Sequence, residues 1–148
     1  MDNLNWKLIL SLSASGIVYG LCTILGWIYG SEYWFAFATL AGVGMLAAWL
    51  SPGTPKRHAF AAGFLTVFLA IWTQILFFDS YMENNPGYAT AKIPFDLDAL
   101  VYTVLFSPLG GLVGGILAGL ASLLVIYVSR KTGNRGSNEK GHMICGHW

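Results

Sequence analysis

Charged side chains are scarce in this sequence, and its four longest apolar stretches contain none. Asp, Glu, Lys and Arg make up 10% of the 148 residues, against roughly 25% in a typical soluble domain. The stretches, which also lack His, are Leu8–Ile28, Tyr33–Leu50, Ala59–Phe78 and Ala99–Val128. An ionisable residue within a membrane segment is the usual marker of an ion or proton path. Its absence argues against a pathway of that kind.

Cysteines and catalytic motifs are also few. Cys22 lies inside the first apolar stretch and Cys145 lies near the C-terminus, so the two predict no disulfide framework. The sequence has no G-x4-GK[ST] phosphate loop and no HExxH motif. A net charge of +1 gives no basic field for nucleic acid. We therefore expect no catalytic residue, no bound cofactor and no nucleic-acid partner, and we expect that the protein is not an enzyme.

The apolar stretches have the length of membrane spans. A hydrocarbon core of about 30 Å requires roughly 20 apolar residues in a helix, and continuous rather than alternating apolar runs favour helices over a barrel. The sequence predicts an all-α membrane protein with four transmembrane helices in a bundle. The spans are expected at about residues 8–28, 33–50, 59–78 and 108–128, within a single domain of residues 1–131.

Charge in the connections predicts the orientation of the chain. Most basic residues fall on one side of this arrangement: Lys7, Lys56, Arg57, Arg130, Lys131, Arg135 and Lys140. Because cytoplasmic loops carry excess Lys and Arg, both termini are expected in the cytoplasm. The basic inner loop, long outer loop and Gly-rich last span resemble the layout of small four-span proteins of bacterial inner membranes. These features are general, so no functional residue is transferred from that resemblance.

The last apolar stretch is too long for one straight span. Ala99–Val128 would extend roughly 45 Å as a helix, and Pro108 interrupts it. We expect the last helix to be kinked near Pro108 or preceded by a short interfacial helix over Asp98–Phe106. Residues 79–98 are expected to form an outer loop with a turn at Asn84–Gly87. Residues 132–148 are expected to form a polar cytoplasmic tail whose composition favours disorder.

Small residues recur at intervals of four in the last span, as in a glycine zipper. They form two rows, Gly111, Gly115 and Gly119 beside Gly110, Gly114, Ala118 and Ser122. Residues four apart share a helix face, and small side chains let two membrane helices approach closely. The rows predict tight packing inside the bundle or, alternatively, docking of another copy or a partner subunit.

Two further groups of polar residues have both a structural and a functional interpretation. Thr66, Thr73 and Gln74 lie inside the third span, where they could hydrogen-bond across helices or form a polar path for a solute. His142, Cys145 and His147 in the tail, with His58 on the same side, are residue types that bind zinc or copper. Their spacing matches no established zinc finger, so no metal site is assigned.

These observations lead to three functional hypotheses. The first is a small integral membrane protein that acts through helix contacts within the lipid bilayer, as a homo-oligomer or as an accessory subunit of a larger membrane complex. The second is a small-solute channel or transporter. The third is a metal-binding membrane protein that uses the His/Cys tail.

Overall fold

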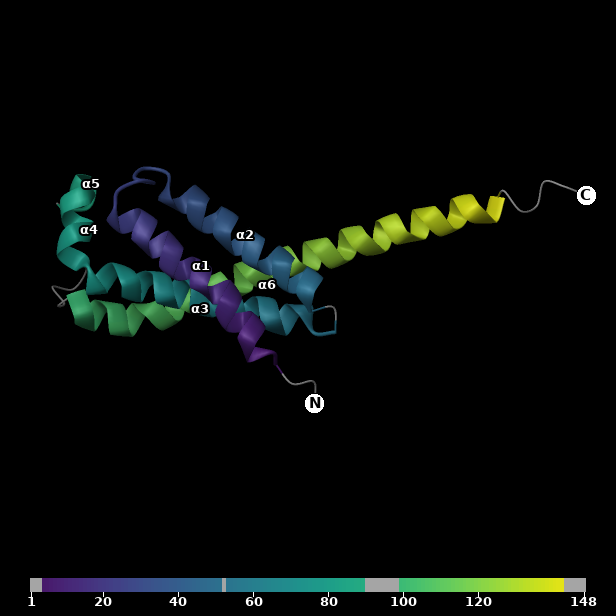
Figure 1. The fold of residues 1–148 in the computed structure, drawn as a ribbon, viewed down its shortest axis with the longest axis horizontal. Helices are drawn as coiled ribbons and strands as arrows, with labels where there is room; N and C mark the ends of the chain where they lie inside the picture. The colour runs from purple at the N-terminus through teal and green to yellow at the C-terminus, as the bar shows by residue number, and fades with distance from the viewer. Residues whose placement is uncertain (1–3, 52, 90–98, 143–148) are drawn as a thin grey trace, which may run out of the picture.

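The computed structural model describes residues 4–51, 53–89 and 99–142, and the regular elements in these ranges are helices (Figure 1). In chain order they are α1 (Trp6–Ile24), α2 (Glu32–Leu50), α3 (Pro55–Leu76), α4 (Phe78–Asn84), α5 (Pro86–Ala89) and α6 (Ala99–His142).

Four of these helices are long and apolar enough to cross a membrane. The corresponding segments are Trp6–Ile24, Glu32–Leu50, Pro55–Leu76 and Thr103–Thr132. Each is close to an expected span, although the first ends four residues earlier than predicted and the last begins five residues earlier. The prediction of an all-helical, multi-pass membrane protein is confirmed in this coarse form.

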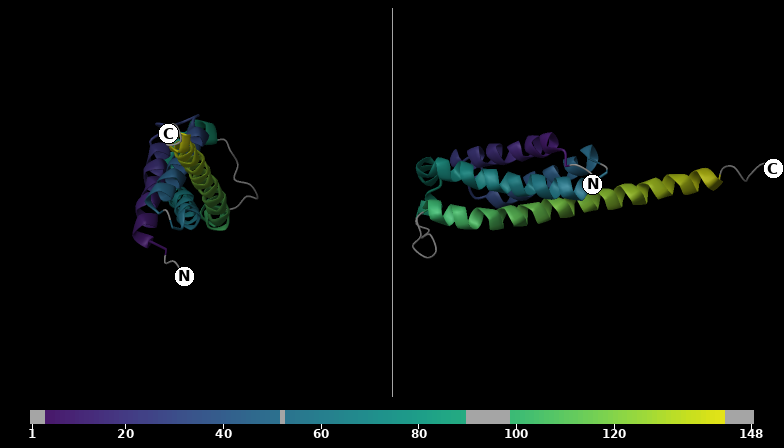
Figure 2. Two further views of the ribbon diagram at one scale, coloured as in Figure 1. Left: turned by 90° about the vertical axis from the view of Figure 1, so that its right-hand side faces the viewer. Right: turned by 90° about the horizontal axis from the view of Figure 1, so that it is seen from below.

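The long helices pack against one another, and the later part of α6 extends beyond the other three (Figure 2). Helix α3 lies centrally and packs most extensively on α6 and α1, while α2 packs on α6 and α3. One buried cluster joins all four helices through Ile9, Val43, Ala62 and Ala118. Since lipid provides no hydrophobic drive between helices, such contacts depend on close van der Waals fit.

Local sequence determines where the helices start. The Asn5 side chain accepts a hydrogen bond from the backbone N–H of Leu8 at 3.2 Å, which caps the start of α1. The α1–α2 turn contains Gly26 and Gly30 at φ of 69° and 78°, a conformation that glycine adopts without steric cost. Pro55 occupies the first turn of α3, where its missing N–H costs nothing.

Helix α6 is one continuous 44-residue helix with Pro108 inside it. The alternative of a separate short helix over Asp98–Phe106 is therefore wrong, while a kink at Pro108 stays a prediction. Proline is tolerated in membrane helices because neighbouring groups re-satisfy the freed backbone atoms. The helix also continues through residue 142, beyond the other helices (Figure 1). The expectation of a disordered segment from Thr132 is therefore wrong up to His142.

The first part of the expected outer loop is helical rather than irregular. Helices α4 and α5 fold back over the end of α1, and two asparagine side chains hold them there. Asn84 Nδ2 donates to the Ile24 carbonyl at 3.0 Å, and Asn85 Nδ2 donates to the Thr23 carbonyl at 2.9 Å. These bonds help to cap the last carbonyls of α1, of which the Thr23 carbonyl also accepts from the Gly26 N–H at 3.0 Å.

Candidate functional site

Gln74 on α3 lies between two cavities at one end of the packed helices. Its side chain and that of Ile71 line both cavities. Gln74 Nε2 donates to Thr23 Oγ1 on α1 at 2.8 Å, and Thr23 Oγ1 donates to the Gly20 carbonyl at 2.6 Å. Because the threonine hydroxyl already donates its single proton, it can only accept from Gln74. The amide is thus fixed in orientation between the cavities.

The first cavity lies between α1, α2 and α3 and has a volume of about 250 Å³. It extends from Tyr33, at the start of α2, to Thr66 near the middle of α3. Its polar lining comprises Tyr19, Tyr33, Thr39, Thr66 and Gln74. A water molecule takes about 30 Å³ of liquid, so this volume suits a few waters or one small solute.

The second cavity lies between α3, α4 and α6 and has a volume of about 380 Å³. Its polar lining comprises Gln74, Tyr81, Thr103 and Ser107. Ser107 is 1% exposed, and its Oγ has no hydrogen-bond partner among the described residues. A buried hydroxyl without a partner costs free energy, so a hydrogen-bonding molecule in this cavity would be stabilised at Ser107.

A buried acid lies at the same end of the helices. Glu32, the first residue of α2, is only 8% exposed. The Tyr19 hydroxyl donates to the Glu32 backbone carbonyl at 3.2 Å. Burial and the nearby Glu32 and Tyr33 raise the pKa of Tyr81 to about 12. Glu32 therefore places a carboxyl group near the polar residues that line the two cavities.

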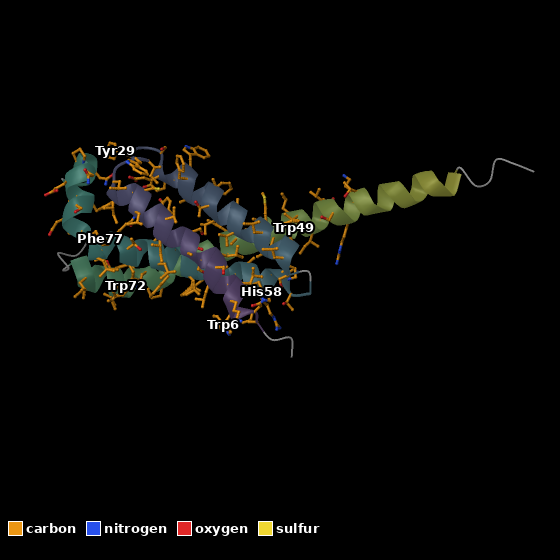
Figure 3. All side chains as sticks on the ribbon, viewed as in Figure 1. Trp6, Tyr29, Trp49, His58, Trp72 and Phe77 are labelled. Atoms are coloured by element: carbon orange, nitrogen blue, oxygen red, sulfur yellow. The ribbon has the colours of Figure 1, made fainter. Side chains whose placement is uncertain are left out.

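The described charges separate by sign along the helices. The acidic end carries Glu32 with the exposed Asp79 and Glu83. The opposite, basic end carries Lys7, Lys56, Arg57, Arg130 and Lys131. Figure 3 shows Trp6 and His58 toward this end, and Tyr29 and Phe77 at the other. An anion is disfavoured at the acidic end, whereas a neutral or cationic solute is not.

The structure brings together two of the three residues expected in a polar path. Thr66 and Gln74 line the first cavity. Thr73 does not line this cavity. Its Oγ1 donates to the Leu69 carbonyl at 2.7 Å, and its methyl group packs close to Gly20. Sequence reasoning missed Tyr19, Tyr33 and Ser107, and its second span at residues 33–50 left Glu32 just outside. Only the charge of Glu32 beside an apolar run could have indicated its position.

Most of the small residues of α6 pack against α3 and α2. A Cβ added at Gly111 or Gly115 would come within 2.9 Å of the Phe64 or Phe60 ring, and one at Gly114 would collide with Val67. Gly110 faces Ile71 and Val67, Ala118 lies against Gly63 and Gly44, and Ser122 is fully buried. Gly119 differs, because a Cβ there would meet nothing within 4 Å. Both rows are therefore largely occupied within the chain.

His58 is a structural residue in this arrangement. It is 2% exposed, and the backbone N–H of Asn5 donates to its Nε2 at 2.9 Å. Its Nδ1 lies 2.9 Å from the Thr54 carbonyl, so the proton is on Nδ1 and both nitrogens are engaged. The described residues contain no group of three or more His, Cys, Asp or Glu that could hold a metal. Cys145 and His147 lie outside the described residues, as does the side chain of His142.

Comparison of the chain with protein-family models, with curated proteins and with solved structures gives no match. Its function must therefore be argued from its own geometry.

Proposed function

We propose that this protein is a small-solute transporter or channel that binds a small neutral or cationic solute at Gln74. The observation that carries the proposal is the position of this one amide between two cavities, each with several polar groups in a largely apolar lining, at the acidic end of four apolar helices. A concave site with a few convergent polar groups is the usual form of a small-molecule site. Amide, hydroxyl and phenol groups would recognise the solute by hydrogen bonds.

The charge pattern supports an orientation for this site. The basic end, with its excess of Lys and Arg, would face the cytoplasm across a bacterial inner membrane, and both termini would lie on that side. The Gln74 cavities would then open toward the outside. On the basic side of Thr66, the buried cluster of Ile9, Val43 and Ala62 fills the space between the helices. Passage of a solute to the cytoplasm would therefore require a conformational change that separates these helices.

Solute entry into proteoliposomes tests this proposal. Vesicles with and without the protein are mixed with glycerol, methylammonium or acetate, and reswelling is followed by stopped-flow light scattering. We expect the protein to accelerate entry of the neutral or the cationic probe but not of acetate. Gln74→Leu should abolish the acceleration and Gly42→Leu should preserve it, because a side chain at Gly42 meets open space. Rates equal to those of protein-free vesicles for all three probes would contradict the proposal.

The second candidate function is association within the membrane, with another copy or as an accessory subunit of a larger complex. The observation that favours it is an apolar groove of about 390 Å³ between α2 and α6, which includes the small residues Ala41 and Ala121. The two predicted rows of α6 are engaged within the chain, so this groove is the better surface for a second helix. Cross-linking of Met45→Cys in native membranes tests it; a strictly monomeric product with no captured subunit would contradict it.

A further inference from the structure

The basic end of the molecule has a second feature, which is independent of the Gln74 cavities. A cavity of about 530 Å³ lies between the start of α3 and the later part of α6. Three cationic side chains line it: Lys56, Arg57 and Arg130. No carboxylate is found in its lining, as far as the described residues go. Residues far apart in the sequence thus form one concentrated positive site.

An apolar groove continues from this positive site along α3 and α6. It has a volume of about 540 Å³ and shares Lys56, Arg57 and Leu123 with the cationic cavity. The rest of its lining is apolar, comprising Leu4, Phe60, Ala61, Gly115, Ile116, Gly119 and Leu120. The space over Gly119 is open, since an added Cβ there meets no atom within 4 Å.

The position and polarity of this surface match one kind of ligand. Tyr127, 67% exposed, lines the cationic cavity, and tyrosines favour the headgroup level of a bilayer. The N-terminus of α3 lies in the same cavity with Thr54 and Pro55, and its free N–H groups attract phosphate. Basic pockets between membrane helices bind anionic lipid headgroups.

We propose that this basic groove binds one anionic phospholipid. Its phosphate would interact with Arg57 and Arg130, assisted by Lys56, and one acyl chain would lie over Gly119 along Phe60 and Leu123. A zwitterionic lipid with the same chains would fit the apolar part but would lose the charge complementarity.

Native mass spectrometry of the detergent-solubilised full chain tests the assignment with three probes. These are phosphatidylglycerol, phosphatidylcholine with the same acyl chains, and inorganic phosphate. We expect retention of one phosphatidylglycerol in preference to phosphatidylcholine, and no adduct with phosphate alone. Each basic residue near a membrane surface contributes roughly fivefold to anionic-lipid affinity. Arg57→Gln and Arg130→Gln should each weaken binding by about that factor.

Matched variants distinguish lipid binding at this site from non-specific effects of positive charge and of apolar surface. Lys7→Gln removes an exposed cation outside both linings and should leave binding unchanged. Gly119→Leu should fill the groove and weaken binding of the lipid, whereas Gly42→Leu adds the same side chain to open space on α2 and should not. Equal losses in Lys7→Gln and Arg57→Gln, equal retention of both lipids, or binding of phosphate alone would overturn the proposal.

Discussion

Gln74 Nε2 donates to Thr23 Oγ1 at 2.8 Å, and this bond joins α3 to α1 beside two cavities. The two residues are 51 positions apart in the sequence. The bond holds the amide nitrogen against α1. Because the amide oxygen has no role in this bond, it is available to a solute as an acceptor.

The contribution of this bond to stability can be measured with a double-mutant cycle. Gln74→Leu and Thr23→Val each remove one partner, and the pair removes both. We expect a coupling free energy of roughly 0.6–2 kcal/mol in the free energy of unfolding, the range for hydrogen bonds between membrane helices. Unfolding by titration with sodium dodecyl sulfate gives the four values. Additive effects of the two substitutions would show that the bond contributes nothing measurable.

The close contact of α3 and α6 predicts that alanine substitutions at two glycines will differ sharply in their effect on stability. A Cβ at Gly63 would lie 2.5 Å from the Ala118 Cβ and 2.6 Å from the Gly114 carbonyl oxygen. We expect Gly63→Ala to lower the free energy of unfolding by about 1–3 kcal/mol, because overpacking forces the helices apart. Gly119→Ala, which enters open space on α6, is the matched control and should be nearly neutral. Similar values for both variants would contradict the described packing.

His58 should be needed for the packing of the basic end. In His58→Ala the Asn5 N–H loses its acceptor, and the Thr54 carbonyl loses the imidazole donor but keeps the backbone N–H of residue 58. Each lost hydrogen bond contributes about 0.5–1.5 kcal/mol, so a lower detergent melting temperature is expected. Gly53→Ala, at an open position in the same connection, should not change it. An unchanged melting temperature for His58→Ala would show that the contacts are dispensable.

Orientation can be tested with cysteines at two exposed positions. Gly53 lies in the α2–α3 connection, beside the basic residues, and Glu83 lies on α4 at the acidic end. In a background without Cys22 and Cys145, a membrane-impermeant thiol reagent should label Glu83→Cys in intact cells. It should label Gly53→Cys only after the cells are permeabilised. The reverse pattern would show that both termini lie outside.

Much of the fold follows from the sequence, because a bilayer leaves few alternatives for an apolar run of about 20 residues. The start of α3 at Pro55 and the end of α2 before the proline-containing connection are typical local signals. Continuity through Pro108 was only one of two predicted alternatives, because tolerance of proline depends on neighbouring helices that a single sequence does not reveal. The helical continuation to His142 was missed for a different reason: composition alone predicts disorder there.

The candidate site was predictable only in part. Thr66 and Gln74 are noticeable because they are polar within an apolar run, and their eight-residue spacing places them on one helix face. Glu32 lies one residue before the predicted second span, and its burial to 8% exposure depends on packing that a single sequence does not reveal. The neutral residues Tyr19 and Ser107 give no signal in the sequence, and only packing shows that they line cavities.

We predict that the cavity that extends from the acidic end to Thr66 admits water and tolerates cations. Thr66→Cys in the background without Cys22 and Cys145, labelled from outside with positively or negatively charged methanethiosulfonates, tests it most directly. We expect Thr66→Cys to react, faster with the cationic reagent, while Ala62→Cys, one turn away in the buried cluster, stays unlabelled. Failure of Thr66→Cys to react with either reagent, or labelling no faster than that of Ala62→Cys, would contradict the account.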